Sequence, residues 1–422
     1  MHPNALLQAA AQLLARVLAF EHPADAVVAR YLREQPRLGP RERAALTETV
    51  YAVLRKKLLF EHLARSGHGA PALRLAILGF AAPREWLLRA LSEEESQWLA
   101  ACDAQPAAEL PADCRHNLPA WLADALQQQL STEEFTALAD ALLQPAPLDL
   151  RVNILKQKRP QVQAELGQHA IEAQATPYSP WGLRVTGKPA LTRLAAYAEG
   201  AFEVQDEGSQ LLALLLQARR GELVVDFCAG AGGKTLALGA AMRGEGRLYA
   251  FDTSAHRLHA LAPRLARSGL RNVHTAAIAH ERDARVQALA GKADRVLVDA
   301  PCSGLGTLRR APDLKWRVTP AQVADHAAQQ AAILQAAAAL VKPGGRLLYA
   351  TCSLLTEENE AVADAFGAQA RGFALLDASQ CLAALKVPAA ATLATRAGHL
   401  RLWPHRHGTD GFFAALWQRG RR

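Results

Sequence analysis

The sequence predicts an α/β protein whose carboxyl-terminal half forms a doubly wound, Rossmann-like sheet. Two observations carry this prediction. From about residue 221 onward, short apolar runs typical of strands alternate with longer runs that have helical spacing. Such alternation is the pattern of a mainly parallel sheet with helices on both faces. Before it, residues 5–130 show only helical spacing, whereas residues 145–210 mix short strand-like runs with Pro and Gly.

These changes in the residue pattern divide the chain into three predicted domains. They are a helical domain at 1–130, a small α+β segment at 131–215 and the α/β domain at 216–422. In the helical part, Pro23 and Pro40 stand where helices should begin. One long helix is predicted over residues 39–65, and its basic face is either solvated or turned toward RNA. That face carries Arg41, Arg43, Arg55, Lys56 and Lys57.

The α/β domain is expected to run in strand–turn–helix units. Strands are expected at 222–230, 246–254, 294–304 and 344–353, and helices at 234–244, 255–270, 320–341 and 358–367. The last segment, 398–417, is predicted to form a hairpin at the edge of the sheet. In sheets of this kind, ligands bind at the carboxyl ends of the strands.

Composition limits the classes of function. The net charge of +8 points to a polyanionic partner, although many basic proteins bind no nucleic acid. The six cysteines form no CxxC pair, which argues against a disulfide scaffold or a zinc ribbon. No stretch approaches about 18 uncharged apolar residues, and the start lacks the basic region of a signal peptide. We expect a soluble cytoplasmic protein without a metal.

The segment "VVDFCAGAGGKT" is a glycine loop between a strand and a helix. A P-loop would need glycine at Cys228, and the dinucleotide fingerprint would need glycine at Thr235. The loop therefore lacks the glycine spacing of a phosphate-binding loop. Asp252, at the end of the next strand, is placed to accept two ribose hydroxyls. Together these features predict S-adenosylmethionine as the ligand; the alternative is an ordinary turn with a solvated aspartate.

Two cysteines, Cys302 and Cys352, each follow a strand and precede a serine. Either alone would be read as a buried, inert thiol. As a pair at the ligand-binding edge they suit methylation of carbon 5 of a pyrimidine. A thiolate adds to carbon 6 and makes carbon 5 nucleophilic, and a second acid or base then helps release the product. Asp299 is placed to hydrogen-bond the cytosine edge.

A basic and aromatic segment follows Cys302. Its side chains are either an RNA surface, in which arginines hold phosphates and a tryptophan stacks a flipped base, or core and solvated residues. The candidates for RNA contact are Arg309, Arg310, Lys315 and Trp316, with Arg317 beside them.

With these motifs in place, the chain resembles the Sun/Fmu (NOL/NOP/Sun-type) family of RNA 5-methylcytosine methyltransferases. It is most similar to bacterial members that methylate 16S ribosomal RNA and carry an amino-terminal NusB-like domain. The resemblance rests on "DFCAGAGGKT", "AFD", "LVDAPCSGLGTLRRAPDLKW" and "YATCSLLTEENE", in that order. It also covers "LRVN", "VQDEGSQ" and "DGFFAALW", so it runs from about residue 145 to the end.

The resemblance implies a methyltransferase fold and assigns roles by position. Cys352 would be the nucleophile and Cys302 would assist release, which argues against a DNA cytosine methyltransferase, where the Pro-Cys cysteine attacks. The cofactor site would comprise Cys228, Ala229, Gly230, Ala231, Gly232, Gly233, Lys234, Asp252 and Asp299.

Two positions depart from the family pattern. Ala231 stands where the family usually has proline, which should cost little. The acidic residue expected after the third strand, at the adenine end of the cofactor, is missing from "AAIAHERDARV". Glu281 or Asp283 is a candidate substitute, although the register points near His280.

The expected activity is therefore methylation of cytosine carbon 5 in 16S ribosomal RNA by a monomer. Two alternatives remain open: the same chemistry on transfer RNA or another ribosomal site, and a non-catalytic RNA-binding or ribosome-assembly factor. Loss of either cysteine or of Asp252 would have favoured the latter.

Overall fold

The computed structural model describes residues 2–421, and their contacts divide the chain into two compact units. The helical unit takes the chain up to Pro145 together with Thr307–Thr319. The sheet unit takes Ala146–Gly306 and the chain from Pro320 onward. Thr307–Thr319 thus belongs with the helices, although the sequence analysis had included it in the 216–422 domain. The division of the chain into three domains, at 1–130, 131–215 and 216–422, remains a prediction.

The helical unit confirms most of the helix starts read from the sequence. Pro40 is the first residue of α3 (Pro40–Arg55), and Pro23 directly precedes α2 (Ala24–Glu34). The long helix predicted over 39–65 is wrong, because the chain leaves helical geometry at Lys56 (φ −114°, ψ 31°) and α4 (Lys57–Ala64) starts anew. The other helices are α1 (Pro3–Val17), α5 (Pro71–Leu78), α6 (Arg84–Leu88), α7 (Glu93–Ala104), η1 (Ala107–Glu109), α8 (Ala112–His116), α9 (Ala120–Gln127), α10 (Thr132–Leu142) and α17 (Leu314–Arg317).

The sheet unit begins with a small antiparallel sheet of order β2-β3-β1-β4. Short strands and helices alternate here, as the sequence predicted for 145–210. The elements are β1 (Leu148–Val152), α11 (Arg159–Gln168), β2 (Ala173–Ala175), β3 (Gly182–Val185), η2 (Leu191–Arg193), α12 (Ala195–Ala198) and β4 (Phe202–Val204).

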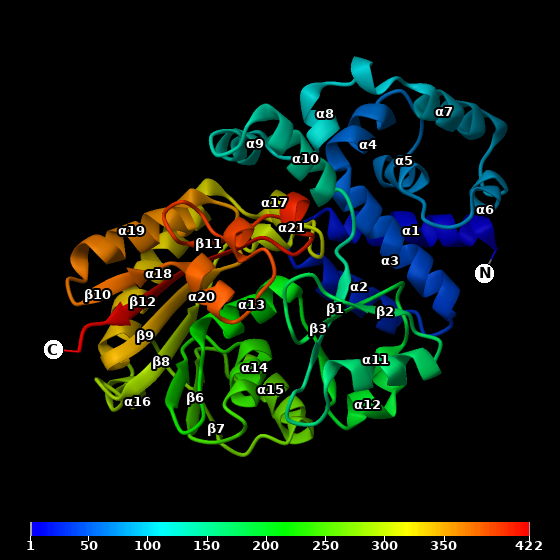
Figure 1. Ribbon diagram of the computed structural model, residues 1–422. Coiled ribbons are helices and arrows are strands. Elements are labelled where there is room, and N and C mark those ends of the chain that lie inside the picture. Colours follow the sequence, from blue (N-terminus) through cyan, green and yellow to red (C-terminus); the bar gives the residue numbers. More distant parts are fainter. Residues whose placement is uncertain (1, 422) are drawn as a thin grey trace. The chain divides into compact units, whose positions relative to one another are not determined.

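The main sheet has the order β10-β12-β9-β8-β5-β6-β7, with β11 paired to β12. Its strands are β5 (Leu223–Asp226), β6 (Arg247–Asp252), β7 (Val273–Ala277), β8 (Ala293–Asp299), β9 (Val341–Thr351), β10 (Phe373–Leu376), β11 (Leu400–Leu402) and β12 (Phe412–Arg419). The run from β7 to β9 is parallel, as predicted. The carboxyl ends of these strands therefore meet at one edge (Figure 1).

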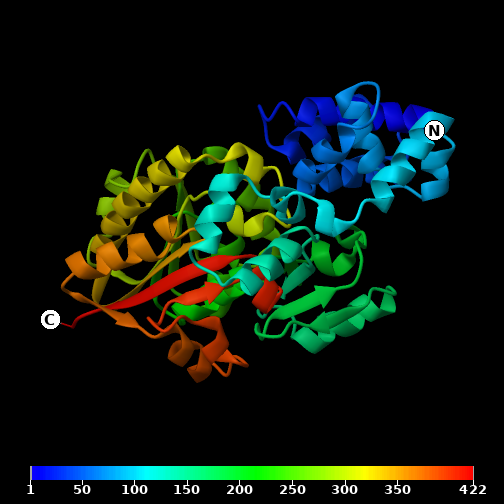
Figure 2. The same cartoon turned by 90° about the horizontal axis from the view of Figure 1, so that it is seen from above.

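The end of the chain corrects one expectation. Strands β11 and β12 do pair, but β12 lies between β9 and β10 rather than at the sheet edge, and it is antiparallel to both (Figure 2). The physical reason is its composition: residues 412–417 are buried on both sides. A strand that is apolar on both faces needs cover from helices and neighbours, which an edge position supplies less well.

Helices cover both faces of the main sheet because its strands alternate between two apolar faces. Val224 and Leu348 belong to the core under α13 (Glu207–Leu216) and α14 (Gly233–Ala241), whereas Val225 and Leu347 belong to the core under α18 (Pro320–Leu340) and α19 (Glu360–Gln369). The remaining elements are α15 (Ala255–Ser268), α16 (Ala284–Gln287), η3 (Leu305–Thr307), η4 (Thr356–Glu358), α20 (Ala378–Ala384), η5 (Ala390–Leu393) and α21 (Pro404–His407). Within residues 2–421, no helix has the length and apolar character needed to span a membrane.

Candidate active site

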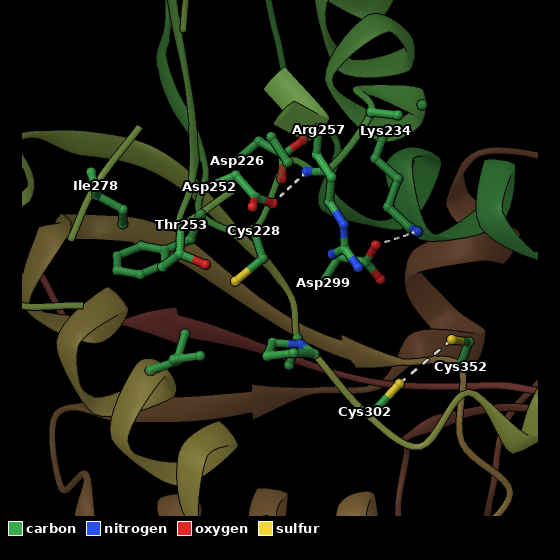
Figure 3. A pocket seen from close by; sticks show the side chains of 18 of the residues that line it. Asp226, Cys228, Lys234, Asp252, Thr253, Arg257, Ile278, Asp299, Cys302 and Cys352 are labelled. Carbon is green, nitrogen blue, oxygen red and sulfur yellow. Dashed lines mark hydrogen bonds and ion pairs between the residues drawn. The ribbon is translucent and has the colours of Figure 1, made fainter. Parts of the chain in front are cut away.

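A cavity of 690 Å³ lies in the sheet unit, at the carboxyl ends of the parallel strands. Figure 3 shows side chains from successive strand ends converging on it. This is the edge at which open α/β sheets bind ligands. The strand ends and the turns after them contribute Asp226, Cys228, Asp252, Ile278, Asp299, Cys302 and Cys352.

The glycine loop forms one wall of the cavity with its backbone. Gly230 (φ +54°) and Gly232 (φ +82°) both adopt the left-handed conformation that side chains disfavour. A Cβ atom on Gly232 would also stand 2.1 Å from Leu261 Cδ1. Ala231 has no positive φ, so alanine fits where the family usually has proline. The loop can therefore pass close to a ligand without side chains in the way.

Asp252 is tied into the loop by its carboxylate. Gly230 N donates to its Oδ2 at 2.8 Å, and Ser254 N donates to its Oδ1 at 2.7 Å. Each carboxylate oxygen has a second acceptor site, so both remain able to receive a hydroxyl. The structure thus holds Asp252 in place at the cavity wall, as a ribose-binding carboxylate requires.

Asp226 has an orphaned oxygen at the base of the cavity. Thr235 Oγ1 donates to its Oδ2 at 2.7 Å, but Oδ1 has no hydrogen-bond partner among the described residues. Burial raises the pKa of this carboxyl to about 7, and the charge of Asp299 adds to the effect. A buried acceptor of this kind favours a ligand that brings a donor or a positive charge. S-adenosylmethionine carries an ammonium and a sulfonium, and it fits a cavity lined by three aspartates.

The segment after β7 bears on the missing adenine-site acid. Ile278, His280 and Glu281 line the cavity. Asp283 instead caps α16, accepting from Ala279 N at 3.1 Å and Arg285 N at 2.9 Å. Of the two candidate substitutes, Glu281 is therefore the one that lines the cavity.

The two cysteines meet in this cavity, with their Sγ atoms 3.5 Å apart. Cys302 follows β8 after a two-residue turn, and Cys352 directly follows β9. The hydrogen bond to Cys352 raises the pKa of the Cys302 thiol well above its ordinary value, and burial and the charges of Cys352 and Glu358 raise it further. Cys302 therefore keeps its proton while Cys352 lies beside it.

Lys234 and Asp299 form an ion pair above the cysteines, with Nζ 2.7 Å from Oδ2 (Figure 3). Burial lowers the pKa of Lys234, but the charges of Asp299 and Cys352 and the hydrogen bond to Asp299 outweigh it, so the pKa is raised overall. Lys234 remains a cation in the cavity. Its partner lies at the end of β8, where the sequence placed the group that contacts cytosine.

The residues predicted to contact RNA lie elsewhere, in the helical unit. Lys315 is 2% exposed and donates from Nζ to Arg55 O at 2.8 Å, while Trp316 Nε1 donates to Leu54 O at 2.8 Å. Burial lowers the pKa of Lys315 to about 7. Both side chains anchor Thr307–Thr319 to α3, and the expectation that they also contact RNA stays a prediction.

The two arginines of the same segment differ from each other. Arg309 is half-buried and donates from Nη2 to Pro145 O at 3.1 Å, which is a structural role. Arg310 is exposed and stays a candidate for RNA contact. Within residues 2–421, no cluster of three or more His, Cys, Asp or Glu side chains is arranged to hold a metal ion.

Sequence reasoning missed one buried charge beside the cysteines. Glu358 is fully buried and accepts hydrogen bonds from Ser303, Ser353 and Gln330. It stands in "TEENE", next to Glu357, which is exposed. Nothing local in the sequence tells the two glutamates apart, since only the tertiary fold brings Ser303 to one of them.

With the geometry established, comparison with known proteins adds independent information. The family model described as "16S rRNA methyltransferase RsmB/F" matches residues 213–418, and a second model, the ferredoxin-like domain of RsmF/B-like methyltransferases, matches 118–192. These matches cover nearly all of the main sheet, most of the cavity lining and most of the small antiparallel sheet.

Individual relatives agree. A protein of Synechocystis sp. named a probable ribosomal RNA small subunit methyltransferase B is 37% identical over 71% of this chain and 66% of its own length. A Bacillus subtilis protein of the same name is 31% identical over 73% of this chain and 67% of its own length. The chain thus spans about two thirds of the length of these relatives, and slightly less for the first. The solved structure of a methyltransferase homologue from Pyrococcus horikoshii is 28% identical with a TM-score of 0.62, covering 75% of this chain and 100% of that one.

Proposed function

Because the chain belongs to the 16S rRNA methyltransferase RsmB/F family, we propose that it methylates carbon 5 of a cytosine in RNA. S-adenosylmethionine is the cofactor of this methyltransferase family and supplies an electrophilic methyl group. Asp252, Asp226 and the glycine loop would hold it. The observation that carries the cytosine proposal is the pair of thiols 3.5 Å apart in the same cavity.

The first steps of the proposed reaction use Cys352 and Asp299. The Cys352 thiolate forms a bond to carbon 6 of cytosine, and the electrons of the 5,6 double bond move toward carbon 5. Asp299 accepts from the cytosine edge and stabilises the adduct in a dry site, with Lys234 balancing the charge. Carbon 5 would then form its bond to the methyl group that the cofactor supplies, as the bond from that methyl group to the sulfonium sulfur breaks and leaves a neutral thioether.

Release of the product needs a base, and we propose that Cys302 becomes this base after the adduct has formed. Two of the causes that hold the proton on Cys302 are the hydrogen bond to Cys352 and the charge of Cys352. Both disappear once Cys352 is bonded to carbon 6, so the Cys302 thiol becomes more acidic and gives up its proton to water. The Cys302 thiolate then removes the proton on carbon 5. The 5,6 double bond forms again and the bond from carbon 6 to Cys352 breaks.

The finer features of the substrate are part of the same proposal. We propose a cytidine of 16S ribosomal RNA, following the family description and the names of the relatives. Transfer RNA or another ribosomal site would require only a different RNA surface. A non-catalytic assembly factor is disfavoured, because both cysteines and all three cavity aspartates are present. We propose that the protein works in the cytoplasm, where it meets ribosomal RNA.

The test is to trap the covalent adduct. Cys302→Ala protein is incubated with S-adenosylmethionine and unmodified small-subunit ribosomal RNA, and a denaturing gel is read for a slowly migrating protein–RNA band. We expect the band in Cys302→Ala and its absence in the Cys302→Ala, Cys352→Ala double variant. Cys381→Ala, which removes a half-buried thiol outside the cavity, is the control and should behave as wild type.

Two results would count against the proposal. If wild type transfers labelled methyl but Cys302→Ala forms no adduct, the roles given to the two cysteines are wrong. If wild type transfers no methyl, a titration with S-adenosylmethionine distinguishes an incorrect RNA from a cavity that does not bind the cofactor.

A further inference from the structure

The residues that follow the two cysteines meet at one carboxylate. Ser303 and Ser353 both donate from Oγ to Glu358 Oε2. The backbone N of Ser303 also donates to Glu358 Oε1 at 2.8 Å, and the two serine hydroxyls lie 3.1 Å apart. Glu358 thus binds the residue directly after each cysteine, in turns that follow two different strands.

Further contacts hold this carboxylate in place. Gln330 Nε2, from α18, lies 3.2 Å from Glu358 Oε1 and 2.9 Å from Pro301 O. The Tyr349 hydroxyl lies 3.0 Å from Gln330 Oε1 and also contacts Glu358 O. His326 Nδ1 stands 3.7 Å from Glu358 Oε1 and lines the cavity. The side chain of Glu358 is completely buried.

A buried charge with this many donors is seldom kept for stability alone. Removing a carboxylate from water is costly, and apolar packing of the same volume is often as stable. An apolar side chain at this position could not accept the hydrogen bonds from Ser303 and Ser353, which connect Glu358 to both cysteine turns. The placement therefore points to a role in the geometry and charge of the cysteine pair.

We propose that Glu358 is a positioning residue that sets the spacing of Cys302 and Cys352 and places its carboxylate beside Cys302, the group that takes the proton from carbon 5. The inference rests on the proposed roles of the two cysteines. Glu358 is not among the residues that line the cavity; it acts through Ser303 and Ser353. Misplacing a reacting group by about 1 Å can cost a factor of about 10² in rate, so a shared anchor has a large effect.

The charge of Glu358 matters most after the adduct has formed. Three elements bring titratable groups toward Cys302. The end of β9 brings Cys352 and Tyr349, and η4 brings Glu358. Helix α18 brings His326, which lies beside Glu358. Once Cys352 is bonded to cytosine, its charge and its hydrogen bond are gone. Glu358 is then the remaining anion that favours protonation of Cys302, so it sets how readily Cys302 takes the carbon-5 proton.

The test isolates this effect by removing Cys352 from the resting protein. In a Cys352→Ala background, the rate of iodoacetamide alkylation of Cys302 is followed against pH, with mass spectrometry of the Cys302 peptide. We expect Glu358→Gln to shift the midpoint to lower pH, on the order of one unit. Glu357→Gln, which removes the neighbouring exposed carboxylate, is the matched control and should leave the midpoint unchanged.

Turnover gives the second readout. In the chain with both cysteines, Glu358→Gln should lower kcat by about 10² while the Kd for S-adenosylmethionine stays within about threefold. Glu358→Asp keeps the charge but is shorter, so it should lower kcat without moving the alkylation midpoint. It also carries the test if Glu358→Gln fails to fold.

The proposal is overturned if Glu358→Gln changes neither the alkylation profile nor kcat, or if it moves both no more than Glu357→Gln does. The alkylation arm needs no methyl transfer. The alkylation experiment therefore tests the effect of Glu358 on Cys302 even if the proposed substrate is wrong. The methylation assay with wild-type protein tests the proposed function separately.

Discussion

Lys234 Nζ lies 2.7 Å from Asp299 Oδ2, which joins the first turn of α14 to the end of β8. Both side chains line the cavity together with the two cysteines. The charge of Cys352 is one of the causes that raise the pKa of Lys234, so the cation and a Cys352 thiolate stabilise each other. Lys234 belongs to the glycine-loop segment predicted to bind the cofactor, and its position also suits it to the chemistry at Cys352.

Replacing Lys234 separates these two roles. We expect Lys234→Met to lower the rate of adduct formation by about 10²–10³, because one preorganised charge is removed from a dry site. The Kd for S-adenosylmethionine should change much less. Lys292→Met, which removes an exposed lysine of the same unit, is the control. A variant that loses cofactor affinity in proportion to its rate would show that Lys234 serves the cofactor alone.

The glycine loop offers a pair of adjacent substitutions with opposite expectations. Gly232→Ala forces an alanine to φ +82° and drives its Cβ toward Leu261, whereas the Cβ of Gly233→Ala meets nothing closer than 3.5 Å. We expect Gly232→Ala to destabilise the protein by about 1–3 kcal/mol and to weaken cofactor binding. Gly233→Ala should melt within a few degrees of wild type. Calorimetry with a cofactor titration measures both, and equal behaviour of the two variants would contradict the assignment.

Asp226 predicts a pH dependence of stability. Burial raises its pKa from 3.8 to about 7 in the folded protein, with Asp299 contributing. Between these values the folded state holds a proton that the unfolded state releases, so stability falls as pH rises through this window. The full contribution is at most about 4 kcal/mol. Asp226→Asn keeps an acceptor for Thr235 and should flatten the fall.

The measurement is thermal unfolding of the cofactor-free protein at pH 5 and pH 8. Asp325→Asn removes an exposed carboxylate of the sheet unit and serves as the control. If wild type and Asp226→Asn lose the same stability between the two pH values, the buried carboxyl of Asp226 does not cause the pH dependence of stability.

Lys315 should act in the opposite direction and at higher pH. Burial lowers its pKa from 10.5 to about 7, so above pH 7 the unfolded state binds the proton that the folded state has released. Stability should therefore rise from pH 7 toward 10 in wild type, and Lys315→Met should remove this rise. Lys56→Met, at an exposed position of the helical unit, is the control. Because Lys315 is buried, Lys315→Met should also leave RNA affinity unchanged. If filter binding shows that a variant folded like wild type loses more than about twofold in RNA affinity, Lys315 does contact RNA.

What the sequence by itself determined is the set of features that depend on neighbours along the chain. The strand–helix alternation identified the parallel part of the main sheet, and the rule for strand ends predicted that Asp252 and Asp299 lie at one edge, where both line the cavity. The glycines were recognisable because only their own backbone angles matter. The two cysteines were recognisable because each stands at the end of a strand, and parallel strands end at one edge.

Tertiary structure alone decided the features that join distant segments. The apolar run of β12 reads the same at an edge or inside a sheet, and only pairing with β9 and β10 placed it within. Lys315 resembles an RNA contact in sequence, yet packing against α3 buries it. Glu357 and Glu358 are identical neighbours, and only the approach of Ser303, fifty-five residues earlier, gives one of them a role. Local periodicity carries no information about such partners, because burial and hydrogen bonding across the fold are settled by the chain as a whole.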